Sequence, residues 1–397
     1  MWSYAPYQRE GAMWALLTIR QQGLAYLAWP ERTRKSGTAL LTAESSKATS
    51  VLIVTKKKAI PGWLDTIEMF VTTKKYKVIN YESIHKVKGS YDFIILDESH
   101  HAISSTGRPS KTWKAVQKFT HKKAILYLSA TPYAEHLGLI YHQLKLSTWS
   151  PFKQRNFYDW FRKYGIPHMT RTPYGLVETY TKYKDEEILK EIDHLFDFKT
   201  RKQVGIEHEP QANVVVVPML DTTKQVIKQV VEEQMFTMGP DIEILMDSPM
   251  KLRTAHYQLE GGTLKVDDKT SILLEQHEKI DYIRNNYDEE DLAIMAHFIK
   301  ERELLEKAFP KARILSSDGH AEGVDLHQVR QLIVYSMSFK TSKHTQRTAR
   351  QANHNRATPI VVDILVADKP GVGKAVYDCV AIKKENFVKS SYERSIK

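Results

Sequence analysis

The stretch IILDESHH (residues 94–101) decides the fold class of this 397-residue chain. Its apolar residues end a longer run, YDFIIL, of the kind that forms a strand buried on both faces of a parallel sheet. Asp97 and Glu98 follow at once, and a parallel sheet would place both carboxylates at its carboxyl edge, where open α/β sheets bind ligands. The pattern therefore predicts a ligand site at the end of a buried strand.

The two carboxylates suit the chemistry of a nucleotide. Asp97 can hold a magnesium ion, usually through water, because Mg²⁺ prefers hard oxygen donors. Glu98 is placed to polarise a water molecule that attacks a terminal phosphate. Most isolated Asp-Glu pairs are polar turns, but the preceding apolar run and the following Ser-His favour the nucleotide interpretation.

Similar strand-like runs alternate with helical stretches in both halves of the chain. In the first half they are 23–29, 50–55, 76–81, 91–98 and 123–130. In the second half they are 213–220, 292–298, 312–317, 330–336 and 358–366. This is the βαβ rhythm of parallel sheets, and the length suits two or three domains of about 100–200 residues. We expect two α/β domains.

The region from 148 to 210 differs from both halves. It begins aromatic and basic and continues into a charged stretch. We predict helical material here that links, or protrudes from, the two α/β domains. Phe157, Trp160 and Phe161 have helical spacing, which favours packing between domains over stacking on nucleic-acid bases. The predicted division of the chain is 1–147, 148–210 and 211–397.

A candidate phosphate-binding loop, LAWPERTRKSGTALLTA (27–43), precedes the acidic strand. Lys35 and Ser36 stand where the Lys-[Ser/Thr] pair of a P-loop is expected: the amine reaches the β- and γ-phosphates and the hydroxyl binds magnesium. Trp29 and Arg34 replace the two glycines of that motif, and side chains there restrict the approach of the backbone to phosphate. A more glycine-rich segment, KPGVGKAV (369–376), is interpreted as a C-terminal turn that enters a helix.

Two N-terminal segments carry further candidates. Gln8, near the start of a helix predicted after Pro6, can present its amide in the bidentate manner that reads adenine. LSATP (128–132) follows another buried strand. Ser129 and Thr131 in it are small hydroxyls that could link the nucleotide site to a second domain.

Two C-terminal segments complete the set. The loop SSDGHAEGVDLHQ (316–328) holds Gly323 and Asp325. In HTQRTARQANHNR (344–356), a predicted basic helix, Gln346 and Arg350 lie one turn apart on the same face. An arginine that one domain supplies to a nucleotide on another accelerates phosphoryl transfer by about 10³–10⁵.

In order and spacing, YQREG, the Lys-Ser turn, IILDESHH, LSATP, SSDGHAEGVDL and QRTAR resemble the motifs of superfamily 2 helicases over nearly the whole chain. The chain is most similar to the compact Swi/Snf-type ATPases, especially phage helicases of branch migration and replication. VLIVTKKKAIPGWLDTI (51–67) and KLRTAHYQLEGG (251–262) support the resemblance. It implies two tandem RecA-like domains, with ATP and Mg²⁺ in the cleft and duplex DNA across both.

The resemblance also implies roles for individual residues. The catalytic residues would be Lys35, Asp97, Glu98 and Arg350, with Ser36 and Asp97 on the metal ion. The nucleotide would be held by Gln8, Arg34, Lys35, Ser36, Gly37, Thr38, Asp97, Glu98, Gly323, Asp325, Gln346 and Arg350. Ser129 and Thr131 would couple the domains.

Two departures from the family pattern bear on activity. Arg34 replaces a glycine of the phosphate loop, and Asn353 replaces the second arginine of the last motif. Arg350 is the retained arginine-finger candidate, with Arg356 as a substitute for the missing arginine. A weak or inactive ATPase remains open, although the retained Lys35, Asp97 and Glu98 favour activity.

Composition narrows the partner and the setting. Lysine and arginine outnumber aspartate and glutamate by 58 to 47, and this net charge of +11 favours an anionic polymer. Cys379 is the only cysteine, which excludes an internal disulfide and a cysteine metal cage. Apolar runs fall short of the ~20 residues of a membrane-spanning helix, and no signal-like pattern opens the chain. We expect a cytoplasmic monomer, in the host cytoplasm if the source is a phage, without membrane contact but with replication or recombination proteins as candidate partners.

The leading hypothesis is an ATP-dependent DNA helicase or translocase that acts on duplex or branched DNA in branch migration, replication or repair. An RNA helicase is the alternative within the same class, because Asp-Glu-Ser-His does not specify the polymer. A nuclease motor subunit is disfavoured, since only VVDILVADK (361–369) places carboxylates near a lysine. The alternative from another class is a nucleic-acid-binding scaffold with a degenerate ATP site, which predicts no hydrolysis.

Overall fold

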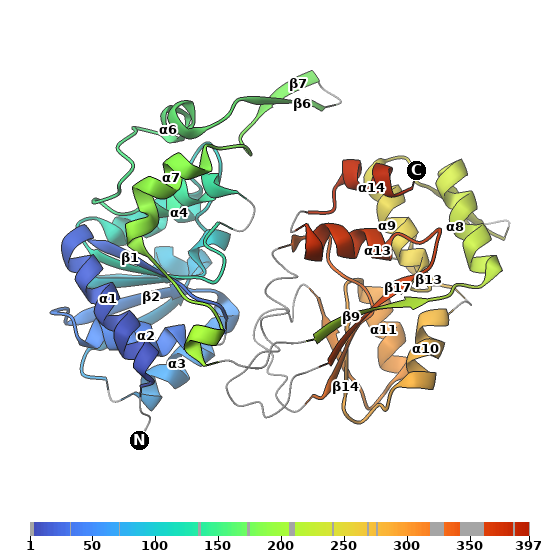
Figure 1. The fold of residues 1–397 in the computed structure, drawn as a ribbon, viewed down its shortest axis with the longest axis horizontal. Coiled ribbons are helices and arrows are strands. Elements are labelled where there is room, and N and C mark those ends of the chain that lie inside the picture. The colour runs from blue at the N-terminus through green and yellow to red at the C-terminus, as the bar shows by residue number, and fades with distance from the viewer. Residues whose placement is uncertain are drawn as a thin grey trace. The chain divides into compact units, whose positions relative to one another are not determined.

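The computed structural model describes residues 4–396 apart from 32, 71, 134–135, 173–174, 206–210, 240–241, 268–269, 275–276, 318–328, 342–360 and 384–385. The chain divides into two compact units, Met1–Glu207 and His208–Lys397. Each unit is an α/β fold on its own parallel sheet, as predicted (Figure 1). Among the described residues, no helix is both long and apolar enough to cross a membrane.

The first unit holds a six-stranded parallel sheet in the order β3-β2-β4-β5-β1-β8. Its strands are β1 Leu24–Ala28, β2 Ser50–Thr55, β3 Lys75–Asn80, β4 Phe93–Asp97, β5 Ala124–Leu128 and β8 Phe196–Phe198. Successive residues of β4 alternate between two apolar cores: Ile94 and Leu96 join one, and Phe93 and Ile95 join the other. Both faces of the sheet are buried, which explains the continuous apolar runs.

The first three helices of the chain cover one face of this sheet, and the next four cover the other face. The core that contains Phe93 is closed by α1 Pro6–Gln22, α2 Lys35–Glu44 and α3 Ile60–Met69. The other core is closed by α4 Lys111–Thr120, α5 Ile140–Leu144, α6 Phe157–Tyr164 and α7 Asp185–Ile192. The turns between β3 and β4 and after β4 form the short helices η2 Tyr81–Lys86 and η3 Ser99–His101.

The segment 148–210, for which we predicted helical material, is only partly helical. It contains α6 and α7, but also the antiparallel hairpin of β6 His168–Thr172 and β7 Gly175–Thr179 and the sheet strand β8. Phe157, Trp160 and Phe161 are buried in the core of the first unit, so they pack within this unit and not between domains as predicted. These contacts, and the pairing of β8 with β1, belong to the first unit, which extends to Glu207 and so takes in most of the segment.

The second unit holds a five-stranded parallel sheet in the order β15-β14-β16-β17-β9. Its strands are β9 Gln211–Val217, β14 Leu292–Ala296, β15 Arg313–Ser316, β16 Gln331–Val334 and β17 Val361–Ala367. The helices are α8 Asp221–Glu233, α9 Pro249–Leu259, α10 Glu278–Asn286, α11 Ile299–Ala308, α13 Gly373–Tyr377 and α14 Lys389–Ser395. Two small hairpins pair β10 Met235–Met238 with β11 Ile242–Leu245, and β12 Thr263–Lys265 with β13 Ser271–Leu273.

The glycine-rich segment near the C-terminus encloses a carboxylate. Val372 N and Gly373 N both donate to Glu260 Oε1, the second at 3.0 Å, and Glu260 is buried. The backbone N–H groups that a phosphate would require are thus bound to an internal acid. The structure agrees with the interpretation of this segment as a turn rather than a phosphate loop.

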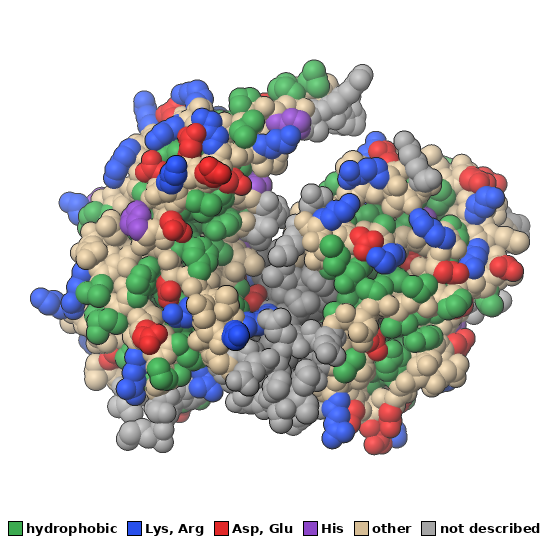
Figure 2. Space-filling model, viewed as in Figure 1, with side chains coloured by type: hydrophobic (Ala, Val, Ile, Leu, Met, Phe, Trp, Pro, Cys, Tyr) green, Lys and Arg blue, Asp and Glu red, His purple; other side chains and the backbone are tan. Residues whose placement is uncertain are grey.

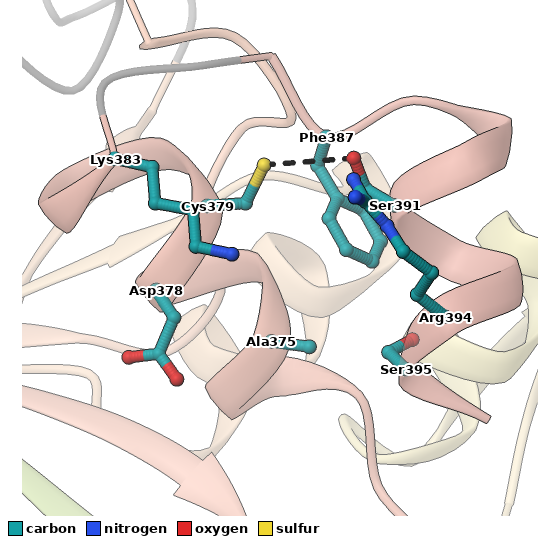
Figure 3. A pocket seen from close by; sticks show the side chains of 8 residues that line it. All are labelled: Ala375, Asp378, Cys379, Lys383, Phe387, Ser391, Arg394 and Ser395. Atoms are coloured by element: carbon teal, nitrogen blue, oxygen red, sulfur yellow. Dashed lines mark hydrogen bonds between the residues drawn. The ribbon is translucent and has the colours of Figure 1, made fainter. Parts of the chain in front are cut away.

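The single cysteine lies in the wall of a cavity of about 230 Å³ between α14 and the π-helical turn Asp378–Ile382 (Figure 3). Cys379 is buried, and its Sγ lies 3.7 Å from Ser391 Oγ and 3.6 Å from the carbonyl oxygen of Asn386. Cys379 thus belongs to the apolar core of the second unit, with its thiol directed at these two oxygens.

Candidate functional site

The carboxyl ends of β1, β4 and β5 lie side by side at one edge of the first sheet, because β5 pairs with both β1 and β4. β4 ends at Asp97, Ser129 follows β5, and β1 leads into the loop before α2. The structure thus brings the candidate phosphate loop, the acidic pair and the LSATP segment to the same edge, although they are far apart in sequence.

The phosphate loop keeps the backbone path of a glycine at Arg34. This residue has φ 57° and ψ 33°, a left-handed conformation that glycine adopts without strain. α2 begins at the next residue, Lys35. The first N–H groups of a helix have no acceptor within it, and together with the helix dipole they favour an anion at this end.

The polar side chains of the loop differ in burial and in hydrogen-bond partners. The Lys35 amine donates to the carbonyl oxygens of Trp29 at 2.6 Å and of Pro30 at 3.3 Å. Ser36 is half-buried at the second position of α2. Thr38 is buried, and its hydroxyl lies 3.4 Å from the Arg34 carbonyl oxygen, to which it donates. Lys35 and Ser36 are the better placed for a phosphate and its metal ion.

Trp29, in the position of the first P-loop glycine, belongs to the core beneath the loop. It is fully buried, and its indole Nε1 donates to Asp197 Oδ2 at 2.8 Å. Gly11 of α1 lies against the ring so closely that a Cβ there would be 2.3 Å from it. This replacement therefore anchors the loop to α1 and β8.

Gln8 is fastened to the phosphate loop. Its Oε1 accepts from Ala5 N at 3.1 Å, and its Nε2 donates to the Arg34 carbonyl oxygen at 3.3 Å. Nε2 would also lie 3.1 Å from a Cβ at Gly37, so that glycine leaves room for it. Because both ends of the amide are bound to protein, reading of adenine by Gln8 stays a prediction.

Asp97 is held by one side chain at the end of β2 and one of α3. Its Oδ2 accepts from Thr55 Oγ1 at 2.6 Å and from Trp63 Nε1 at 2.9 Å. Within the described part of the chain, Oδ1 accepts no hydrogen bond and is the oxygen that could bind a metal ion. Burial and then the charge of Glu98 raise the pKa of Asp97, while the two hydrogen bonds and the Lys35 ammonium oppose that rise.

Glu98 has a strained backbone. Its φ of 51° and ψ of 38° are unusual for a residue with a side chain, and such strain is typical of functional sites. Its N–H donates to the Leu128 carbonyl oxygen at 2.8 Å, which fixes the turn against β5. Its Oε2 lies 3.4 Å from Ser129 Oγ and 3.6 Å from His100 Nδ1.

His100 connects this carboxylate to the LSATP segment. Its Nδ1 lies 3.0 Å from Ser129 Oγ, and its Nε2 lies 3.5 Å from Thr131 Oγ1. Ser129 Oγ also accepts from Thr131 N at 3.0 Å. Glu98, His100, Ser129 and Thr131 thus form one chain of contacts across the ends of β4 and β5.

A buried amide that sequence reasoning missed ties the same two segments together. Gln143 Oε1 accepts from Ser99 Oγ at 2.7 Å and from Tyr26 OH at 3.0 Å. Its Nε2 donates to the Pro132 carbonyl oxygen at 2.7 Å. Gln143 lies on α5 outside any motif, and no signal in the sequence marks it.

The donor set of this edge fits a nucleoside triphosphate with Mg²⁺. Lys35 and the N-terminus of α2 would hold phosphate, and Asp97 Oδ1 with Ser36 Oγ would hold the metal ion. Mg²⁺ prefers oxygen donors and usually keeps several water ligands beside a carboxylate and phosphates. Glu31, the acid in the loop, has its pKa raised by burial, and the Lys35 ammonium opposes that rise.

Several predicted residues lie outside the described residues: Gly323, Asp325, Gln346, Arg350, Asn353 and Arg356. Their roles stay predictions. The structure adds Trp63 to the residues of the site. Trp63 lies in the segment 51–67, which supported the resemblance to superfamily 2 helicases. Its contact with Asp97 spans 34 residues and has no local signal.

Comparison with known proteins finds a family model that matches part of the first unit. Residues 31–134, about a quarter of the chain, match the family model described as "Type III restriction enzyme, res subunit". The match begins in the phosphate loop and contains the acidic strand and the LSATP segment.

The chain is also similar to solved structures. One is the Sulfolobus solfataricus SWI2/SNF2 ATPase core domain, 12% identical, with a TM-score of 0.45 over 98% of this chain and 90% of that one. Another is the ATP-dependent Type ISP restriction-modification enzyme LlaBIII bound to DNA, 11% identical, with a TM-score of 0.49 over 100% of this chain and 29% of that one. Similarities of this size transfer neither residues nor activity.

The family match covers the part of the first unit in which the phosphate loop, the acidic strand end and the LSATP segment meet. With the order of the motifs along the chain, it makes this part of the protein similar to a superfamily 2 helicase/ATPase domain.

Proposed function

We propose that this protein is a nucleic-acid-dependent ATPase that moves on DNA, with duplex or branched DNA preferred to RNA. The observation that carries the proposal is the meeting of Lys35, Asp97 and Glu98 at one sheet edge beside the N-terminus of α2. A cation, a metal-binding carboxylate and a candidate general base are the parts that phosphoryl transfer to water requires.

Each group has a separate task in this proposal. The Lys35 amine exchanges its loop carbonyls for phosphate oxygens, and the α2 N–H groups hold the same phosphates. Asp97 would hold Mg²⁺, while Thr55 and Trp63 donate to its Oδ2 and fix the carboxylate. Glu98 orients and deprotonates the attacking water. Bound Mg²⁺ would neutralise charge that develops on the phosphates.

Coupling to nucleic acid would pass through His100. It contacts Glu98 on one side and Ser129 and Thr131 on the other, so a shift of the LSATP segment would move the general base. We propose that nucleic acid adjusts Glu98 through this contact. Arg350 and Gln346 would contribute to the same nucleotide from the second unit.

The distribution of charge supports an anionic polymer as partner. The first unit has 32 lysines and arginines against 19 acids, a net charge of +13. The second unit has 26 against 28, a net charge of −2. Acidic side chains lie among the basic ones on the face of the second unit seen in Figure 2. We propose that the first unit supplies most of the electrostatic attraction for nucleic acid.

An ATPase assay with single-stranded, duplex and branched DNA and with duplex RNA tests this function. The proposal expects stimulation by duplex or branched DNA and loss of hydrolysis in Lys35→Ala, whereas the exposed lysine variant Lys47→Ala serves as the unaffected control. Greater stimulation by RNA would favour the RNA helicase. Absence of hydrolysis with every polymer would favour a nucleic-acid-binding scaffold.

A further inference from the structure

Helix α4 carries a row of lysines that the proposed ATPase site does not use. Lys111, Lys114 and Lys118 are exposed on one side of α4, while Trp113 and Val116 are buried on the other. At 1.5 Å per residue, the outer two lysines are about 10 Å apart along the helix. This distance corresponds to about three base-pair steps of duplex DNA at 3.4 Å each.

The sequence on either side of this row contains no acidic residue. Between Glu98 and Glu135 lie six lysines and arginines, and neither aspartate nor glutamate occurs. Within the described part of the chain, the three α4 lysines form no ion pair. Like charges three or four positions apart destabilise a helix, so the row carries a cost that an anionic partner would remove.

Several lysines on other helices form ion pairs with an acid of the same helix. Lys228 of α8 pairs with Glu232, Lys300 of α11 with Glu303, and Lys389 of α14 with Glu393. The row on α4 therefore differs from an ordinary solvated helix face, in which charges of both signs alternate.

The element beside α4 continues the positive charge. η2 packs against α4, and Ile84 of η2 shares an apolar core with Trp113. His85 and Lys86 of η2 are exposed. Glu82 is the one acid of η2, and it accepts a hydrogen bond from Asn80 Nδ2 at 2.6 Å.

The row is fixed rigidly to the body of the first unit. Trp113 Nε1 donates to the His142 carbonyl oxygen at 2.6 Å, and Thr120 Oγ1 donates to the Leu146 carbonyl oxygen at 2.9 Å. Because α4 connects the parallel strands β4 and β5, it runs from the edge that carries Glu98 towards the opposite edge. The lysines therefore follow the flank of the unit away from the nucleotide site.

We propose that Lys111, Lys114 and Lys118 form an accessory surface that binds the phosphate backbone of nucleic acid. Lysines act on phosphate as point charges, so the contact is independent of base sequence. The surface would keep the polymer on the protein without taking part in hydrolysis. This inference rests on the proposed function, because it assumes a nucleic-acid substrate.

The test measures binding of labelled duplex and single-stranded DNA by fluorescence anisotropy over a range of salt. Lys111→Gln/Lys114→Gln/Lys118→Gln is compared with the wild type and with a control, Lys228→Gln/Lys311→Gln/Lys389→Gln. The control removes the same charge from exposed lysines of the second unit. Lys111→Arg/Lys114→Arg/Lys118→Arg tests rescue by restored charge.

We expect the α4 variant to bind about 10-fold more weakly. The slope of log affinity against log salt should fall in magnitude by about 2–3, because each lost phosphate contact lowers it by about 0.9. Hydrolysis without DNA should be unchanged, while half-maximal stimulation should need more DNA. The control and the arginine variant should resemble the wild type.

Equal slopes for the α4 variant and the wild type would overturn the accessory surface, as would an equal loss in the control. This outcome is independent of the proposed function, because stimulated hydrolysis would persist. If the wild type bound DNA through α4 but never hydrolysed ATP, the proposed function would fail and the surface would stand.

Discussion

At the scale of single residues, the site depends on two positions with left-handed backbone, Arg34 and Glu98. Arg34 directly precedes α2, and Glu98 directly precedes the short helix η3. A glycine at either position would adopt this backbone conformation without strain. The family pattern has glycine at the first position, and the structure shows why arginine is tolerated there: the loop keeps the same backbone angles. At the second position a carboxylate is required by the proposed chemistry, so the strain is retained.

Arg34→Gly should therefore leave the free energy of unfolding of the first unit within about 1 kcal/mol of the wild type, because relief of strain offsets the added chain entropy. Arg34→Val should lower it by about 1–2 kcal/mol or more. Urea unfolding followed by tryptophan fluorescence reports on this unit alone, since all seven tryptophans lie in residues 2–160. Equal loss in both variants would show that the arginine side chain, rather than the backbone, decides the effect.

Trp63 should act on the metal ion through Asp97. Trp63→Phe keeps the ring but removes the N–H that holds Oδ2. Loss of such a supporting hydrogen bond typically weakens metal binding by about 10–100-fold. We expect the Mg²⁺ concentration for half-maximal ATPase activity to rise about 10-fold. Trp113→Phe, which removes an indole N–H far from Asp97 in sequence, is the control, and a similar rise in it would refute the specific role of Trp63.

At the scale of elements, the second unit contains a buried ionic cluster around α10 and α11. Glu260, Lys279 and Glu301 are all buried. Glu301 Oε2 accepts hydrogen bonds from Phe298 N and Ser336 Oγ. Burial raises the pKa of Glu301 to about 7, although Ser336 and Lys279 oppose that rise. Burial also raises the pKa of Glu260 and lowers that of Lys279.

This cluster gives the stability of the second unit a defined pH dependence. The pKa of Glu301 is higher in the folded state than in the unfolded state, so the folded state binds more protons. The free energy of unfolding should decrease as pH rises from about 4.5 to about 7, by on the order of 3 kcal/mol, and the Glu301 contribution should be flat above that range.

Glu301→Gln should remove this part of the dependence and make the second unit relatively more stable at pH 8. Reaction of the single buried thiol, Cys379, with a maleimide in urea reports unfolding of this unit. Each curve is normalised to the unfolded protein at the same pH. Parallel pH profiles for the variant and the wild type would disprove the assignment.

The elements also show which parts of the fold sequence reasoning could reach. The strands of both parallel sheets other than β8 were predicted, because burial in a parallel sheet leaves apolar runs. The β6–β7 hairpin was not predicted, because β7 has no buried residue that would give an apolar run: Leu176 and Val177 are exposed. β8 was missed because a strand of three residues is too short to show a periodic pattern. Its place in the sheet comes from pairing with β1, in which Phe196 lies opposite Tyr26.

The candidate site divides in the same way. Lys35, Asp97 and Glu98 were predicted because strand ends and a helix start are visible locally. Gln143 and the contact of Thr55 with Asp97 were not, since each depends on residues 42 or more positions apart that only the folded sheet brings together.

At the scale of the whole molecule, the excess of positive charge belongs to the first unit. The net charge of +11 over the whole chain is the sum of +13 and −2 over the two units. We therefore expect an anionic partner to bind mainly to the first unit, and within that unit to α4. In this account one unit holds both the chemistry and most of the attraction for nucleic acid.

The central claim is that the edge of the first sheet hydrolyses ATP through Glu98, and DNA-stimulated ATP hydrolysis by Glu98→Gln tests it most directly. The variant keeps the size and hydrogen-bonding capacity of the side chain but removes the base. We predict at least a 100-fold lower rate than the wild type, with nucleotide affinity changed less than about threefold. A rate within a factor of a few of the wild type, or no hydrolysis by the wild type on any DNA, would contradict the account.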